Sequence, residues 1–305
     1  MTEESKRNLP ASVLARLLNR ARETGDDYQT LVNSYASERF LYRLGSSPVR
    51  DRFVLKGAML FRIWSGQPYR ATRDLDLLHR GEGSRDVIRR DVEAILATVV
   101  EPDGLFFDAS SIRLEEIRPE DEYAGVRLTM KVRCGSFRAS FQVDVGVGDA
   151  VWPLPARDRM KSLLDMPESE VLVYAPDSVV AEKLEAIVVL GDRNSRIKDF
   201  FDLRYLADHH AFDRPTLSEA VRRTFARRRT PVPPEDPFGL TDAYWESPGR
   251  SVQVRAFASR SGLEAGPQVL DTIPTVLRSF LLPVLEDIRS GRPVEGTWSP
   301  PGPWH

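Results

Sequence analysis

The sequence contains few of the residues that form disulfides or bind metals through nitrogen and sulfur. Its 305 residues include one cysteine, Cys134, and four histidines. One cysteine excludes an intramolecular disulfide and indicates a reducing compartment, and so few soft ligands argue against a structural zinc site. The chain also has no run of about 20 apolar residues, which a membrane-spanning helix requires, and no apolar core near its start, which a signal peptide requires. We therefore expect a cytoplasmic enzyme or binding protein.

A strong charge of either sign is likewise missing. Lysines and arginines number 43 against 45 aspartates and glutamates, so the net charge is -2. Any affinity for nucleic acid must then come from a local patch. A dense basic run over 221–231 contains five arginines: Arg222, Arg223, Arg227, Arg228 and Arg229. Because arginine suits phosphate recognition, this run could receive RNA, and a solvated helix end is the alternative interpretation.

The spacing of apolar residues in the first part of the chain predicts a mixture of helices and strands. Helical spacing predicts helices over 9–24, 27–44 and 84–100. Between them, the segment 52–64 changes period at Gly57, which predicts a strand, a turn and a helix. A hydrophobic content of 41% is enough for a sizeable core, in one large domain or two smaller ones.

A β-rich stretch and then a helical one follow. Two alternating runs, 127–134 and 137–147, predict a hairpin. From about residue 176 the pattern becomes helical, with candidate helices over 177–190, 197–210, 215–229, 238–259 and 266–290. The tail, 298–305, is too rich in proline and glycine for a packed element. The sequence thus predicts an α/β (α+β) domain over 1–165 and a mostly helical domain over 166–305.

Two aspartates share one face of a predicted strand over 73–78. Because side chains alternate along a strand, Asp74 and Asp76 leave the same face, and Leu75 and Leu77 point into a core. Carboxylates this close repel each other unless a cation lies between them, and hard oxygen ligands suit Mg²⁺ or Mn²⁺. The pair predicts a divalent metal site, with a solvated strand end as the alternative.

Two further features favour phosphate chemistry. Asp144 is a lone acid in the apolar strand 137–147; it is either a third ligand of the metal or an edge-strand acid that faces water. Lys56, Gly57 and Ala58 form the turn between a strand and a helix, where backbone N–H groups can approach a phosphate. A phosphate turn, a carboxylate pair and a third acid, in this order, are the parts that two-metal phosphoryl transfer needs.

Four segments also give the sequence a resemblance to a known family. They are LKGAML (55–60), RATRDLDLL (70–78), VDVGVGD (143–149) and EKLEAIVVLGDRNSRIKDFFDLRYL (182–206). Together they resemble the AbiEii/MenT family of bacterial toxins, within the DNA polymerase beta-like nucleotidyltransferase superfamily. The last segment is the most specific, because a helical Glu-Lys-Leu, an arginine-bearing turn and Lys-Asp-x-x-Asp-Leu are characteristic of this family.

The resemblance implies a fold and a set of site residues. The fold would be that of a nucleotidyltransferase, with a small mixed sheet, flanking helices and a helical second domain that completes the active-site cleft. Asp74 and Asp76 would be the metal-binding pair, and Asp144 matches the third acid by strand position. Lys183 would contact the nucleotide phosphates, and Asp199 would be a further polar residue essential to the toxin.

Residue by residue, the match has weaker points. Ala58 stands where the superfamily often has serine or glycine, so phosphate binding at the turn would rest on backbone groups. Lys183 lies at the border of an apolar helical stripe, from which its ammonium could reach a cleft or only solvent, and its removal should cost little stability. The cations Arg193, Arg196 and Lys198 crowd a helix start, which a bound phosphate would explain and a solvated turn would also allow.

The sequence therefore predicts a metal-dependent nucleotidyltransferase toxin of a type IV-like toxin–antitoxin or abortive-infection system. Its substrate would be a nucleoside triphosphate, its cofactor Mg²⁺ or Mn²⁺, its acceptor an RNA such as tRNA, and its partner a winged-helix antitoxin. The alternatives are a small-molecule or protein acceptor, and a nucleotide-binding protein without turnover. The intact acids and Lys183 argue against the last alternative, and the basic run over 221–231 favours RNA over a small molecule.

Overall fold

The chain folds as two units, which are described separately. The computed structural model describes residues 3–66, 74–117, 125–261, 267–292 and 294–305. The first unit comprises Met1–Gly148 and Ala156–Val173, and the second comprises Asp149–Pro155 and Tyr174–His305. The boundary between the units thus lies after Val173 rather than after residue 165. The short segment Asp149–Pro155, which precedes this boundary, also belongs to the second unit. Residues 70–73 of the family-like segment lie outside the described part of the chain.

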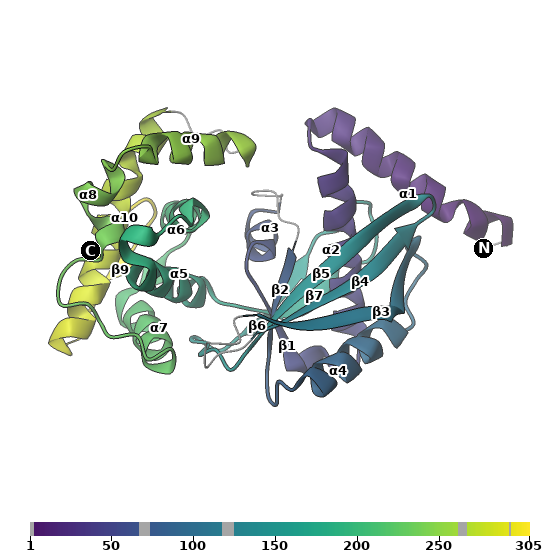
Figure 1. Cartoon of the computed structure of the whole chain (residues 1–305), viewed down its shortest axis with the longest axis horizontal. Coiled ribbons are helices and arrows are strands. Elements are labelled where there is room, and N and C mark those ends of the chain that lie inside the picture. Colours follow the sequence, from purple (N-terminus) through teal and green to yellow (C-terminus); the bar gives the residue numbers. More distant parts are fainter. Residues whose placement is uncertain (1–2, 67–73, 118–124, 262–266, 293) are drawn as a thin grey trace. The chain divides into compact units, whose positions relative to one another are not determined.

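A seven-stranded mixed sheet forms the centre of the first unit (Figure 1). Its order is β3-β4-β5-β2-β1-β7-β6, with β2 parallel to β5, β1 parallel to β7 and the other neighbours antiparallel. The strands are β1 (Phe53–Lys56), β2 (Asp74–His79), β3 (Leu105–Ile117), β4 (Gly125–Cys134), β5 (Phe137–Val147), β6 (Ala156–Met160) and β7 (Ser169–Val173). The predicted strands and hairpin are confirmed, whereas the sequence did not single out β6 and β7.

Helices cover the apolar face of this sheet, and polar side chains line its other face. They are α1 (Glu3–Thr24), α2 (Tyr28–Ser46), α3 (Met59–Ser65) and α4 (Arg85–Ala97), with a 3-10 turn at Arg50–Arg52. Phe40 of α2 packs against Phe107 of β3 and Phe141 of β5, with ring centroids 6.0 and 5.4 Å away. Along β4, buried apolar residues alternate with exposed or half-buried polar ones. The alternation fixes which face of the sheet is apolar and which is polar.

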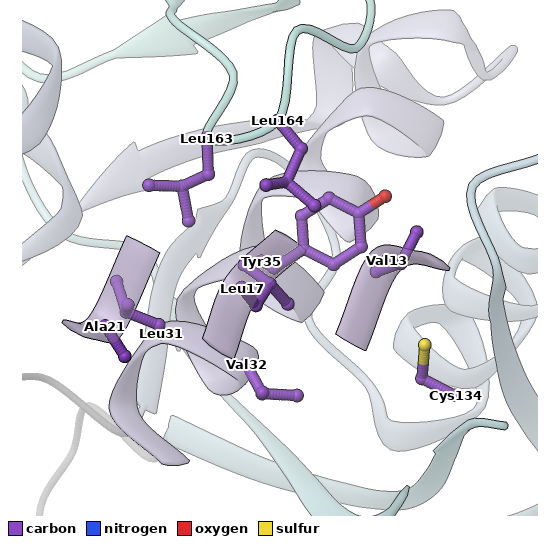
Figure 2. Close-up of a cluster of buried hydrophobic side chains, with 9 residues drawn as sticks. All are labelled: Val13, Leu17, Ala21, Leu31, Val32, Tyr35, Cys134, Leu163 and Leu164. Carbon is purple, nitrogen blue, oxygen red and sulfur yellow. The ribbon is translucent and has the colours of Figure 1, made fainter. Parts of the chain in front are cut away.

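The packing of α1 and α2 is shown in Figure 2. Val13 and Leu17 of α1 and Tyr35 of α2 lie against Leu163 and Leu164 in this apolar cluster. The cluster also contains Cys134, and burial raises the pKa of its thiol to about 11. The cysteine is therefore a core residue that stays protonated at neutral pH.

The second unit is mostly helical. It contains α5 (Pro176–Leu190), α6 (Ile197–His209), α7 (Arg214–Arg227), α8 (Asp242–Trp245), α9 (Arg250–Arg260) and α10 (Pro267–Ser290). Short 3-10 turns at Gly191–Arg193 and Phe238–Leu240, and a two-stranded pair of β8 (Phe212–Asp213) and β9 (Thr297–Trp298), complete it. Among the helices that the structure describes, none combines the length and apolar character that crossing a bilayer requires.

Two predictions for this unit are wrong. The single helix expected over 238–259 is broken into three elements, because Pro248 cannot continue the hydrogen-bond ladder and Gly249 takes φ +81°. The tail is packed rather than loose: Trp298 is 1% exposed, and its indole N–H donates to the Ala207 carbonyl at 2.7 Å. Its aromatic residues bury enough surface to outweigh the conformational cost of the prolines and glycines around them.

Candidate functional site

The strand–turn–helix around Gly57 forms as predicted. β1 ends at Lys56, Gly57 adopts φ +70°, and Ala58 precedes α3. The left-handed backbone favours glycine, and close packing makes it necessary. A Cβ added at Gly57 would lie 2.1 Å from Asp76 Oδ2 and 2.7 Å from its Cγ. The predicted phosphate turn and the predicted metal-binding carboxylate are therefore in direct contact.

A row of charged residues crosses the polar face of the sheet at this level. In strand register, Asp76 of β2 lies between Lys56 of β1 and Asp144 of β5, and Asp144 lies beside Arg127 of β4. Asp74 is two residues from Asp76 on the same face, as predicted. Leu75 and Leu77 are fully buried on the other face. The sheet thus brings all three predicted acids together, with a cation at either side.

Arg127 is a site residue that sequence reasoning missed. Its guanidinium donates to both Asp144 carboxylate oxygens, at 2.9 and 2.8 Å, and Gln142 donates to the same carboxylate at 3.1 Å. The hydrogen bond to Asp144 raises the pKa of Arg127, and the negative charges of Asp144, Asp74 and Glu115 raise it further. Its position on the polar face of the predicted hairpin was a usable indication, but its partner depends on strand order.

The carboxylates suit a divalent cation that is completed by substrate. In the described part of the chain, no three His, Cys, Asp or Glu side chains are grouped closely enough to hold a metal ion alone. Mg²⁺ is commonly held by one or two carboxylates together with water and substrate phosphates, and Asp74 and Asp76 fit that donor set. Asp144 is paired with Arg127, and its role as a third ligand stays a prediction.

The contact at the turn gives a first testable expectation. Gly57→Ala should destabilise the fold by about 2–5 kcal/mol, through backbone strain and a clash with Asp76, and should reduce nucleotide transfer. Gly66→Ala is the matched control, because Gly66 has φ +72° but no atom within 4 Å of an added Cβ. That control should lose only about 1–2 kcal/mol. Equal thermal stability and activity in the two variants would contradict the contact.

In the second unit, Lys183 of α5 and Asp199 of α6 are brought together. Lys183 Nζ lies 2.7 Å from Asp199 and 2.8 Å from Asp202, whose side chains are 1% and 0% exposed. Burial lowers the pKa of Lys183, but the charges of Asp202 and Asp199 raise it by more, so the ammonium stays charged. Lys183 pairs with two buried carboxylates instead of reaching only solvent, so we now expect its removal to cost more stability than the sequence suggested.

The predicted cation cluster beside this helix start is partly explained from within the protein. Arg196 caps α6, and its Nε lies 2.7 Å from Asp199 Oδ2. Lys198 follows in the first turn of α6, as predicted from the sequence. Asp199 thus holds Lys183 on one side and Arg196 on the other, which makes it a positioning residue for both. Phosphate binding by Arg196 and Lys198 stays a prediction.

Four arginines of the basic run over 221–231 are exposed, and Arg228 is half-buried. Arg228 lies 2.8 Å from Glu185, 3.1 Å from Asp149 and 3.5 Å from Glu182. Arg222 and Arg223 both pair with Glu219, and Arg223 also stacks on Trp152. Three of its five arginines therefore pair with acids of the same unit, with Arg222 and Arg223 sharing one carboxylate, and the binding of RNA by this run stays a prediction.

Comparison with known proteins identifies one family. The family model described as "Nucleotidyl transferase AbiEii toxin, Type IV TA system" matches residues 39–273. The crystal structure of JHP933 from Helicobacter pylori is 12% identical, covers 87% of this chain and 98% of its own, and has a TM-score of 0.44. That of a provisionally assigned nucleotidyltransferase from H. pylori is 16% identical, covers 79% and 100%, and has a TM-score of 0.41. No curated protein matches significantly.

Proposed function

The chain belongs to the AbiEii family of nucleotidyltransferase toxins of type IV toxin–antitoxin systems, and we propose that it transfers a nucleoside monophosphate from a nucleoside triphosphate to RNA. The observation that carries this proposal is the contact of Asp76 with the Gly57 turn, beside Asp74 and Asp144. A phosphate-binding turn and acidic side chains in one place are what nucleotidyl transfer requires. We propose tRNA as the RNA and a winged-helix protein as the antitoxin.

The reaction exchanges a phosphoanhydride bond for a phosphodiester bond. A hydroxyl oxygen of the acceptor forms a bond to the α-phosphorus, the bond from that phosphorus to the bridging oxygen breaks, and pyrophosphate leaves with the electron pair. The hydroxyl proton passes to water or a carboxylate. Asp74 and Asp76 would hold a divalent cation, Mg²⁺ or Mn²⁺, which supplies charge neutralisation at the phosphates. Arg127 limits the repulsion among the three acids, since it is paired with Asp144.

We propose that Lys183 donates a hydrogen bond to the triphosphate. Two of its three N–H donors are directed to Asp199 and Asp202, and its side chain is 13% exposed. The remaining donor is then fixed in direction, because the two carboxylates hold the ammonium. Asp199 acts through Lys183 and Arg196 rather than on the substrate itself.

Incubation with each of the four labelled nucleoside triphosphates tests the acceptor class. With Mg²⁺ and total RNA, we expect one or more nucleotides to label an RNA band of tRNA size on a denaturing gel. Purified tRNA should take the label at the same rate. Label in a small molecule or in protein, with unlabelled RNA, would assign the enzyme to another acceptor, and no transfer at all would leave only nucleotide binding.

A further inference from the structure

The polar face of the sheet carries a basic area that the proposed chemistry has not used. We call it the basic sheet face and define it by Arg113 of β3, Lys131 and Arg133 of β4, Arg138 of β5, and Phe106 of β3. Register places them together: Arg133 lies between Phe106 and Arg138, and Lys131 is in the next row. All five side chains are exposed. They belong to three adjacent strands of one unit (Figure 1).

Within the part of the chain that the structure describes, no acid pairs with these four cations, in contrast to Arg222, Arg223 and Arg228. Arg138 donates only to the backbone carbonyls of Gly135 and Phe137. The basic sheet face is therefore a local positive surface on a chain whose net charge is -2.

One acid lies within this surface. Asp108 is opposite Lys131 in register and accepts hydrogen bonds from the backbone and side chain of Ser110. The Ser110 side chain lowers the pKa of Asp108, and the charges of Arg133 and Lys131 lower it further. Four cations outnumber Asp108 and Glu115, which lies two residues from Arg113 on the same face, so the surface stays positive.

Phe106 gives the surface an aromatic platform. Its side chain is 50% exposed, on a sheet face where its neighbours are polar, and the Arg133 guanidinium lies 4.3 Å from the ring centroid. A phenylalanine left open beside arginines has little value for folding. Exposed aromatic rings flanked by cations are the usual means of holding single-stranded nucleic acid, because every base can stack on a ring.

The basic sheet face leads directly to the acids. The next row contains Arg113, Thr129 and Gln142 in register, and the last of these lies beside Asp74. The rows of Arg133 and Arg127 are about 20 Å apart, at about 3.4 Å per residue of β4. The polar groups between them, Thr129 and Gln142, are half-buried. A strand of RNA that is held on the cations can therefore end at Asp74 and Asp76.

We propose that the basic sheet face binds the single-stranded end of the RNA acceptor, an inference that rests on the proposed nucleotidyl transfer to RNA. A base stacks on Phe106, the phosphates contact Arg133, Arg138 and Lys131, and the terminal nucleotide reaches the carboxylates. Charge complementarity and continuity with the acids favour RNA over a protein partner as the occupant.

The test measures RNA binding by the full chain across a series of salt concentrations. The probes are a fluorescein-labelled single-stranded RNA 12-mer and deacylated total tRNA. Arg133→Ala/Arg138→Ala should make the log–log salt dependence shallower by about 1.4, or about 0.7 for each lost contact. Phe106→Leu should weaken binding about fivefold or more, whereas Phe106→Tyr should restore it. ATP affinity by calorimetry should not change in these variants.

Arg80→Ala/Arg90→Ala is the matched control. Both arginines are exposed and donate only to backbone carbonyls, at 3.5 and 3.3 Å. The control should keep wild-type RNA binding and salt slope. The Arg133/Arg138 and Phe106 variants could also keep wild-type RNA binding and salt slope while the wild type labels RNA. In that case the basic sheet face does not bind RNA, and the proposed function stands. If the wild type labels no RNA with any nucleotide, the proposed function itself fails.

Discussion

Asp76→Ala is expected to abolish nucleotide transfer and to leave the chain folded. Its carboxylate lies between Lys56 and Asp144 in strand register and against the Gly57 turn. Removal of a cation ligand from a phosphoryl-transfer site removes several kcal/mol of transition-state stabilisation, or about 10³-fold in rate. Stability should change little, because the loss of one carboxylate also relieves repulsion from Asp74 and Asp144. Transfer of labelled nucleotide and thermal unfolding measure the two effects.

The matched control is Glu115→Ala on the same sheet face. Glu115 lies beside Arg127 in register and is exposed, so this substitution also removes a carboxylate from the charged row. It should keep transfer within a few-fold of the wild type. Asp76→Asn should be as inactive as Asp76→Ala, since an amide is a poor ligand for Mg²⁺. Wild-type turnover of either Asp76 variant in Mg²⁺ would remove Asp76 from the site.

Lys183→Ala is expected to destabilise the second unit by about 3–5 kcal/mol, which is the usual cost of leaving a buried charge without its partner. Asp199 and Asp202, which are 1% and 0% exposed, would lose the ammonium that pairs with both, and Arg196 would still pair with Asp199. Four of the five tryptophans belong to this unit, namely Trp152, Trp245, Trp298 and Trp304. Urea unfolding that is monitored by tryptophan fluorescence therefore reports mainly on the stability of the second unit.

A second substitution separates the structural role of Lys183 from its proposed role at the triphosphate. Lys183→Met/Asp202→Asn removes one charge of each sign and should recover most of the stability that Lys183→Ala loses. Transfer should stay low in the double variant, because no ammonium remains for the phosphates. Recovery of both stability and transfer would limit Lys183 to folding. A stable Lys183→Ala variant would contradict the buried ion pair itself.

Local patterns in the sequence were sufficient to predict the sheet acids. Alternation over 73–78 placed Asp74 and Asp76 on one face and the two leucines in the core, since direction along a strand depends only on its period. Gly57 indicated a turn because the spacing of apolar residues changes there from that of a strand to that of a helix. The proximity of Asp144 needed strand order as well, and there the family resemblance supplied what periodicity could not.

Features that depend on distant partners could not be predicted in this way. The acids that surround Lys183 and Arg228 come from other helices and loops, so a helical projection shows two solvated cations where the fold has buried ion pairs. The basic sheet face could not be predicted either, because its residues are far apart in the sequence. Phe106, Lys131 and Arg138 lie on three strands, and only their register makes them one surface.

The most direct test of nucleotidyl transfer compares two positions of the label in the same triphosphate. With label at the α-phosphate, RNA should become radioactive in the presence of Mg²⁺. With label at the γ-phosphate, the radioactivity should appear only in released pyrophosphate, and RNA should stay unlabelled. Asp76→Ala should show neither product. Label from the γ-phosphate in RNA, or α-label in RNA without pyrophosphate release, would contradict the account.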